Sequence, residues 1–218
     1  MNIKAHQIVK TIVFVKEQLD NAEGGHDWFH IQRVLNNAML IAKGEDVDLF
    51  VVQLGALLHD IADSKFHKGD ETIGPTVARE FLRKLNVNST VIEHVVKIIE
   101  NVSFAGGNEH QTFKSLELDV IQDADRLDAI GAIGIARTFN YGGFKHRAMF
   151  DPEIKPNLEM TKAEYKASNA PTINHFYEKL LLLKDKMNTK TARKIAADRH
   201  KFMQQFLEQF YAEWEGKK

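Results

Sequence analysis

Apolar residues recur at intervals of three and four positions along most of this 218-residue chain. In the first segment Ile8, Ile12, Val15 and Leu19 follow this spacing, which places them on one face of an α-helix. No segment shows sustained two-residue alternation between hairpin turn signals, the pattern that is typical of paired strands. The sequence therefore predicts an all-α fold.

Turn-forming residues separate the apolar runs and set the expected helix boundaries. Gly44 fits a helix stop, and Pro75 fits the first turn of a new helix. After a first helix that ends near Leu19, we expect helices at about 26–43, 48–63, 75–85, 89–102, 116–140, 171–187 and 189–214. The segment 141–170 is expected to be largely irregular. The chain length favours one domain with a sizeable core.

Charge and composition exclude several classes of protein. The chain has 29 basic and 30 acidic residues, so it lacks the excess charge that attracts nucleic acid polymers or anionic membranes. It has no cysteine, which excludes disulfides and thiolate metal sites and leaves metal binding to histidine, aspartate and glutamate. The N-terminal residues lack the features of a signal peptide, and no apolar run has membrane-spanning length, so a cytoplasmic location is expected.

A histidine and an aspartate, His59 and Asp60, stand side by side near the end of the almost wholly apolar segment 48–63. Burying an imidazole and a carboxylate without partners costs several kcal/mol, and one divalent cation would satisfy both. The alternative is a polar helix end that faces solvent. Two further polar residues on otherwise apolar helical segments, His30 and Asp125, favour the cation.

These four residues offer two imidazoles and two carboxylates. Such a set suits Mn, Fe, Ni, Zn or Mg, and a six-coordinate ion would keep positions for water and substrate. Asp123 competes with Asp125 for the last ligand position. The two lie two residues apart on different faces of a regular helix, so only one can point at the site. We expect Asp125 to be the ligand and Asp123 to be a partner of another ligand or of a basic side chain.

Three segments carry a resemblance to a known family. They are Gly-His-Asp-Trp-Phe-His-Ile-Gln-Arg-Val at 25–34, Ala-Leu-Leu-His-Asp-Ile at 56–61 and Asp-Ala-Asp-Arg-Leu-Asp-Ala at 123–129. In this order they resemble the HD-domain metal-dependent phosphohydrolases, most closely the small bacterial members that are similar to nucleotide hydrolases. The resemblance implies one all-helical domain over 1–218, an HD-domain bundle. Its core would lie at about 26–139, with two C-terminal helices at about 171–215 packed on it.

The same resemblance implies the metal ligands and the reaction. His30, His59, Asp60 and Asp125 would hold one divalent ion, expected to be manganese, with Ni, Fe, Mg, Co or Zn as alternatives. The expected reaction is hydrolysis of a phosphate ester or anhydride in a small nucleotide, a nucleoside or deoxynucleoside phosphate, with pyrophosphate as one conceivable product. No nucleic acid polymer or membrane is expected as a partner, and a homodimer stays an open alternative.

Other residues are candidates for proton transfer and phosphate binding. Asp63 lies three residues after Asp60, hence near it on a helix face, and is a candidate general acid or base. Lys65 is a candidate phosphate contact and catalytic residue, and His26 is either a catalytic-site residue or a polar residue at a helix start. Further cations that could bind substrate phosphate are Arg126, Arg137, Lys145 and Arg147. The alternative for these charged groups is plain solvation.

Two other interpretations of the function stay open. His94 and His110 could bind the second metal of a dinuclear HD-type enzyme, either a cyclic-dinucleotide phosphodiesterase or, with two irons, an oxygenase. The chain could also be a non-catalytic, metal-binding regulatory module.

Two repeated patterns are not assigned to chemistry. Gly106-Gly107 and Gly142-Gly143 match no phosphate-loop spacing and are expected in turns or flexible lids. Aromatic residues recur every four positions near the C-terminus, which predicts a packing stripe that could form a dimer surface if it is exposed. They are Phe202, Phe206 and Phe210.

Overall fold

The computed structural model describes residues 2–20, 27–61, 72–102, 113–161, 164 and 167–218. All regular secondary structure in these residues is helical, which confirms the all-α prediction. None of the helices within these ranges is both long enough and apolar enough to cross a membrane. The chain divides into two compact units, Met1–Asp125 and Arg126–Lys218, and the expectation of a single domain stays a prediction.

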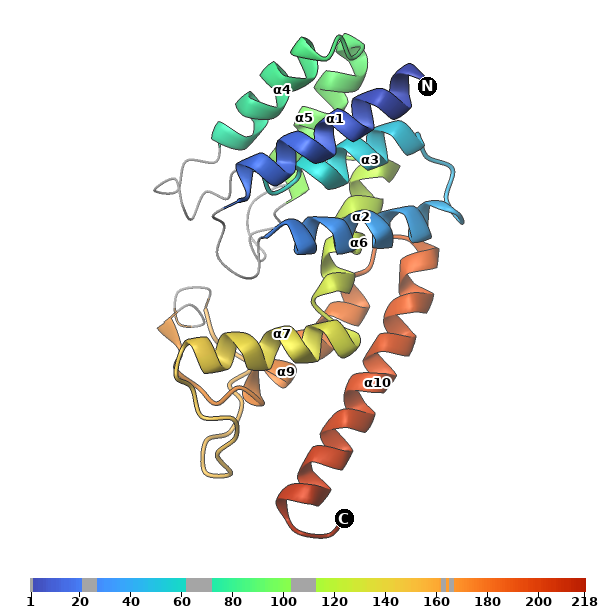
Figure 1. Ribbon diagram of the computed structural model, residues 1–218. Helices are drawn as coiled ribbons and strands as arrows, with labels where there is room; N and C mark the ends of the chain where they lie inside the picture. Colours follow the sequence, from blue (N-terminus) through green and yellow to red (C-terminus); the bar gives the residue numbers. More distant parts are fainter. Residues whose placement is uncertain (1, 21–26, 62–71, 103–112, 162–163, 165–166) are drawn as a thin grey trace. The chain divides into compact units, whose positions relative to one another are not determined.

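The first unit is built around helix α3, which contacts α1, α2 and α5 (Figure 1). The helices of this unit are α1 (Ile3–Gln18), α2 (Trp28–Ala42), α3 (Leu49–Leu58), α4 (Ile73–Lys84), α5 (Ser89–Val102) and α6 (Leu116–Asp128), and α6 runs on past the unit boundary. Every α3 residue except Leu49 and Gln53 is buried. A helix that is apolar all round needs neighbours on all sides, which explains its central place.

Local sequence signals fix how the helices of the first unit begin and pack. Asp27 and Asp48 are the N-caps of α2 and α3, and their side chains accept hydrogen bonds from backbone N–H groups of the first turn. Gly55 allows α3 to approach α6 closely, since a Cβ atom there would lie 2.5 Å from Ile121 Cδ1. Gly55 therefore brings α3 against α6, and α2 packs on α3.

The helix expected over 48–63 ends earlier than predicted, at Leu58. His59 is the C-cap residue, and Ile61 N–H donates to the Leu58 carbonyl three residues before it. The apolar pattern predicted the helix correctly but not its last turn, because the stop comes from local backbone geometry. His59 and Asp60 therefore stand just beyond the helix end, where their side chains can turn toward neighbouring helices.

The second unit contains a cluster of aromatic side chains. Its helices are α7 (Gly131–Phe144), the short α9 (Asn174–Glu178), the 3-10 helix η2 (Leu180–Lys186) and α10 (Lys190–Trp214). Phe206 and Phe210 of α10 contact Phe139 of α7, with ring centroids 5.9 Å and 6.5 Å apart. This confirms the predicted packing stripe for these two residues, whereas Phe202 is 49% exposed.

Three expectations for the C-terminal half are wrong. The helix expected over 116–140 is two helices, because the chain turns at Gly131, whose φ of 77° lies in the left-handed region. Since α7 then continues to Phe144, Gly142 and Gly143 are helical and do not form a turn or lid. The long helix expected over 171–187 is a short α-helix followed by a 3-10 helix. Gly106 and Gly107 lie outside the described residues.

Candidate metal centre

His59 is held in one orientation at the end of α3. Its Nδ1 atom lies 2.9 Å from the Ala56 carbonyl oxygen, and the side chain is 9% exposed. Because a carbonyl oxygen only accepts hydrogen bonds, Nδ1 carries the proton of this bond. The Nε2 atom of the neutral ring therefore keeps its lone pair, as a metal-binding histidine requires.

His30 comes from the first turn of α2 and is 3% exposed. Its backbone N–H donates to the Asp27 side chain over 2.9 Å, so the helix cap fixes the residue that carries the imidazole. The rings of His30 and His59 meet edge to face, with centroids 5.5 Å apart. Two helices thus bring two imidazoles to one place.

Asp60 completes a group of three potential ligands. One ligand atom from each of His30, His59 and Asp60 lies within 4.8 Å of the other two. These three predicted metal ligands, from segments about 30 positions apart in sequence, do converge. The set offers two nitrogen donors and one carboxylate, which divalent transition metals accept.

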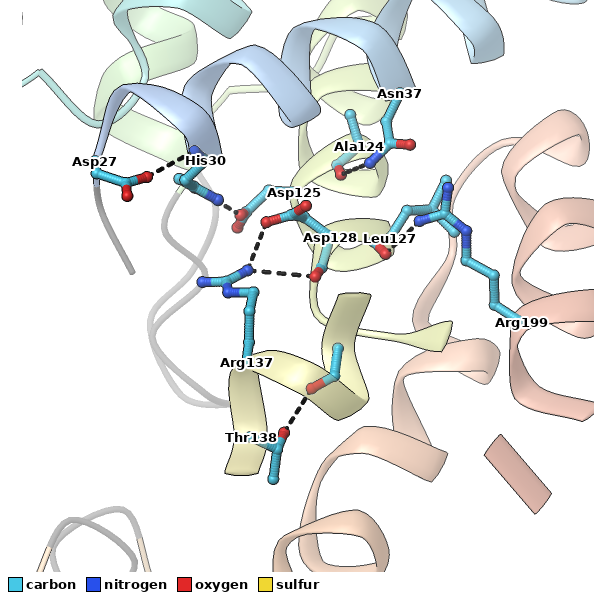
Figure 2. A network of polar contacts seen from close by, with 11 residues as sticks. Asp27, His30, Asn37, Ala124, Asp125, Leu127, Asp128, Arg137, Thr138 and Arg199 are labelled. Carbon is cyan, nitrogen blue, oxygen red and sulfur yellow. Dashed lines mark hydrogen bonds and ion pairs between the residues drawn. The ribbon is translucent and has the colours of Figure 1, made fainter. Parts of the chain in front are cut away.

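Asp125 lies beside His30 (Figure 2). Its Oδ1 atom is 3.5 Å from His30 Nε2, and its side chain is 47% exposed. One residue earlier on α6, the Ala124 carbonyl accepts a hydrogen bond of 3.2 Å from buried Asn37 of α2, which ties the two helices together. Asp123, the competing candidate, is fully buried. Helix periodicity therefore separates the two aspartates as expected.

The spacing of His30 and Asp125 fits a shared ion better than a direct hydrogen bond. A contact of 3.5 Å exceeds the usual N–H to oxygen range. Ligand atoms about 2.1 Å from a four- to six-coordinate ion are about 3.0 to 3.4 Å from one another. We use "metal centre" below for His30, His59, Asp60 and Asp125.

Several other predicted residues lie outside the described residues. These are His26, Asp63, Lys65 and His110. The four remaining candidate cations all belong to the second unit, where each has a contact of its own. Arg126 donates to the Lys186 carbonyl, Arg137 pairs with Asp128, and Arg147 donates to the Ser168 carbonyl. Lys145 stands over the rings of Tyr141 and Phe144.

His94, the described candidate for a second metal, lies near the other end of α6. Its Nε2 atom is 2.9 Å from Ser115 Oγ and 3.5 Å from Glu117 Oε2, at the start of that helix. Glu117 precedes Asp125 by eight residues, which is about 12 Å along a helix axis. This position does not favour a second ion bridged to the metal centre through His94.

Asp27 and Asn37 make hydrogen bonds next to the metal centre but are not among the predicted site residues. An aspartate three residues before His30 is a detectable N-cap signal. Asn37 lies seven residues after His30, and therefore on the same helix face. Its carbonyl partner on α6 could not be identified without the tertiary structure.

Known proteins are similar to this chain over most of its length. Residues 28–130 match the HD domain family. Bacillus subtilis YpgQ, an uncharacterized protein, is 38% identical over 199 residues, which span 90% of this chain and 88% of YpgQ. A crystal structure of an HD-superfamily hydrolase from Bacillus thuringiensis has a TM-score of 0.79 and 44% identity, and covers 97% of this chain and 98% of that chain.

A second solved relative contains a nucleotide. The crystal structure of Bacillus subtilis YpgQ in complex with ADP has a TM-score of 0.77 and 34% identity, and covers 97% of both chains. The family match includes every residue of the metal centre, and the similarity to these relatives extends over nearly the whole chain. From its three sequence segments, its all-α fold and these relatives together, we conclude that the chain belongs to the HD domain family.

Proposed function

We propose that this protein is a metal-dependent phosphohydrolase that cleaves a phosphate ester or anhydride of a small nucleotide. The observation that carries the proposal is the convergence of His30, His59 and Asp60, with Asp125 3.5 Å from His30. The family's solved relatives include a protein described as a hydrolase, and YpgQ was crystallised with ADP. The first supports a hydrolytic reaction, and the second supports a nucleotide as the substrate.

The four side chains suit a divalent ion in two respects: the donor atoms that they offer, and the way in which the two histidines are held in place. His59 presents Nε2 because Nδ1 is engaged by Ala56, and His30 is fixed by burial and by the Asp27 cap. The two carboxylates supply negative charge beside two neutral donors, a set that suits manganese and also Ni, Fe, Mg, Co or Zn. A divalent ion held there would supply Lewis acidity and lower the pKa of a water molecule toward neutrality.

Hydrolysis also requires residues that accept or donate a proton and residues that bind the phosphate oxygens. We assign the proton of the attacking water to Asp63, and His26, four residues before His30 in the sequence, is a second candidate for proton transfer. Lys65 and one or two of four candidate cations would bind the phosphate oxygens, whose charge rises in the transition state. Those cations are Arg126, Arg137, Lys145 and Arg147. A cytoplasmic enzyme acting on free nucleotides fits this chemistry.

The direct test is turnover by protein first stripped of metal with a chelator. Mn, Ni, Fe, Mg, Co and Zn would be added back separately, with a panel of nucleoside and deoxynucleoside mono-, di- and triphosphates. We expect release of phosphate or pyrophosphate only with metal, and its loss in Asp60→Ala. Exposed Asp46, outside the site, provides the control Asp46→Ala, which should behave as wild type. No metal-dependent release from any nucleotide would count against the proposal.

A further inference from the structure

Two arginines hold the C-terminal end of α6 (Figure 2). Arg199 of α10 donates from Nη1 to the Leu127 carbonyl oxygen over 2.5 Å. Arg137 of α7 donates from Nη1 to Asp128, over 2.5 Å to the carboxylate and 3.3 Å to the backbone carbonyl. The last two residues of the helix are thus each hydrogen-bonded to one arginine, Leu127 to Arg199 and Asp128 to Arg137.

The end of a helix is where positive charge is most effective. The last carbonyl groups lack intrahelical partners and carry the negative end of the helix dipole. Asp128 adds a carboxylate that is 1% exposed, and a buried charge requires a charged or hydrogen-bonding partner. Two arginines on these groups therefore fix both the backbone and the side chain of the terminal turn.

The side chain of Arg199 packs against Gly131, where a larger residue would not fit. Gly131 has a φ of 77°, and a Cβ atom there would lie 3.0 to 3.2 Å from three carbons of the Arg199 side chain. Any larger residue would thus meet both an unfavourable backbone conformation and the arginine stem. Burial lowers the pKa of Arg199, and the nearby charge of Asp128 opposes that change. The glycine, the arginine and the aspartate form one interlocked group at the helix end.

Asp125, the ligand from α6, precedes Asp128 by three residues on the same continuous helix. Residues three apart share a helix face and move together as the terminal turn frays or tightens. A metal site requires its side chains to be held within about 0.5 Å of their working positions. We infer that Arg199 and Arg137 are positioning residues, which keep the last turn of α6 ordered so that Asp125 can bind metal. The inference rests on the metal centre of the proposed function.

A purely structural role would give a different result, because it would change stability alone. The test therefore measures Mn²⁺ binding to folded protein without any nucleotide, by titration calorimetry and by the Mn(II) paramagnetic resonance signal. All measurements are made well below the melting temperature of each variant, which circular dichroism provides. Arg199→Ala is expected to weaken Mn²⁺ binding about tenfold, as for other residues that orient a ligand, and Arg199→Lys to restore part of the loss.

Arg193 provides a matched control on the same helix. It also donates to two backbone carbonyls, those of Met187 and Asn188, at 3.0 and 3.1 Å, and neither acceptor belongs to α6. Arg193→Ala should lower the melting temperature without changing Mn²⁺ affinity. If Arg199→Ala does not fold, Arg137→Gln tests the same inference through the other arginine, with the same expected loss.

The outcomes separate this inference from the proposed function. Wild-type Mn²⁺ affinity in folded Arg199→Ala and Arg137→Gln would overturn the positioning role, even if the enzyme hydrolyses nucleotides. Equal losses in Arg193→Ala and Arg199→Ala would overturn it too, because they would point to general stability. Weakened binding only in the α6-contacting variants would support it, whether or not a nucleotide substrate is found.

Discussion

His30 Nε2 and Asp125 Oδ1 lie 3.5 Å apart, which joins the first turn of α2 to the last turn of α6. The imidazole is 3% exposed and the carboxylate 47% exposed, so the pair spans the boundary between the protein interior and solvent. A metal ion bound there would be anchored on the buried side and open on the other. A catalytic metal site needs such an accessible side, whereas a structural site is closed.

Replacing Asp125 by asparagine should weaken Mn²⁺ binding at least about tenfold, because the change removes a ligand charge beside His30. Titration calorimetry on metal-free protein measures the effect. Since the carboxylate is half exposed, the free energy of unfolding should change little.

The matched variant is Asp123→Asn, two residues earlier on the same helix. Asp123 is fully buried, so this variant should lose about 1 to 3 kcal/mol of stability while its Mn²⁺ affinity stays close to wild type. The reverse pattern, with affinity lost in Asp123→Asn and kept in Asp125→Asn, would show that Asp123 is the ligand.

Asn37 should be needed for the α2 and α6 contact that supports this pair. Replacing it by alanine removes a buried donor to the Ala124 carbonyl and should cost about 1 to 3 kcal/mol in urea unfolding. The neighbouring Asn36 is exposed, and Asn36→Ala should leave stability within about 0.5 kcal/mol of wild type. Equal effects of the two variants would mean that the hydrogen bond contributes nothing measurable.

Much of the first unit could be predicted because its signals are local. The helix expected over 89–102 is observed as Ser89–Val102, since its apolar spacing and flanking polar residues are unambiguous. Polar residues on apolar helices, together with the family resemblance, predict that His30 meets His59 and Asp60, and the three side chains do lie together. Neither periodicity nor composition alone would have paired those segments.

What could not be predicted depends on contacts between distant residues. The end of α6 at Asp128 reflects the left-handed conformation of Gly131, which packs against Arg199 about 70 positions later. The 3-10 helix Leu180–Lys186 has leucine-rich spacing that equally suits an α-helix. Arg137 was expected at a substrate phosphate, whereas the partner found for it is Asp128. A substrate contact by Arg137 stays a prediction.

Gly142 and Gly143 are adjacent in α7 but should respond oppositely to alanine. A Cβ atom on Gly142 would lie 2.2 Å from Thr172 Oγ1, whereas one on Gly143 would meet nothing within 4 Å. Gly142→Ala should therefore cost about 1 to 3 kcal/mol through overpacking. Gly143→Ala should gain up to about 1 kcal/mol, because alanine is the better helix former.

Urea unfolding followed by circular dichroism measures both changes. The two variants differ in position by one residue and in composition not at all, so each is the control for the other. Stabilisation by both substitutions would mean that Gly142 has more space than the Thr172 contact allows.

His175 should make stability depend on pH in the acid range. Burial, together with the nearby positive charges of Lys179 and Arg147, lowers its pKa from 6.5 to about 4. Between these two values the unfolded chain binds a proton that the folded protein does not, so acid favours unfolding. The stability present above pH 6.5 is therefore lost progressively as the pH falls toward 4, by about 3 kcal/mol in all at roughly 1.4 kcal/mol per pKa unit.

The measurement is urea unfolding at several pH values between 7.5 and 4.5, with wild type compared to His175→Gln. The variant sets its own baseline, but its stability should fall less steeply with acid because residue 175 no longer titrates. Exposed His6 provides the control, since His6→Gln should keep the wild-type slope. Parallel slopes for wild type and His175→Gln would mean that the folded protein protonates this imidazole as readily as the unfolded chain does.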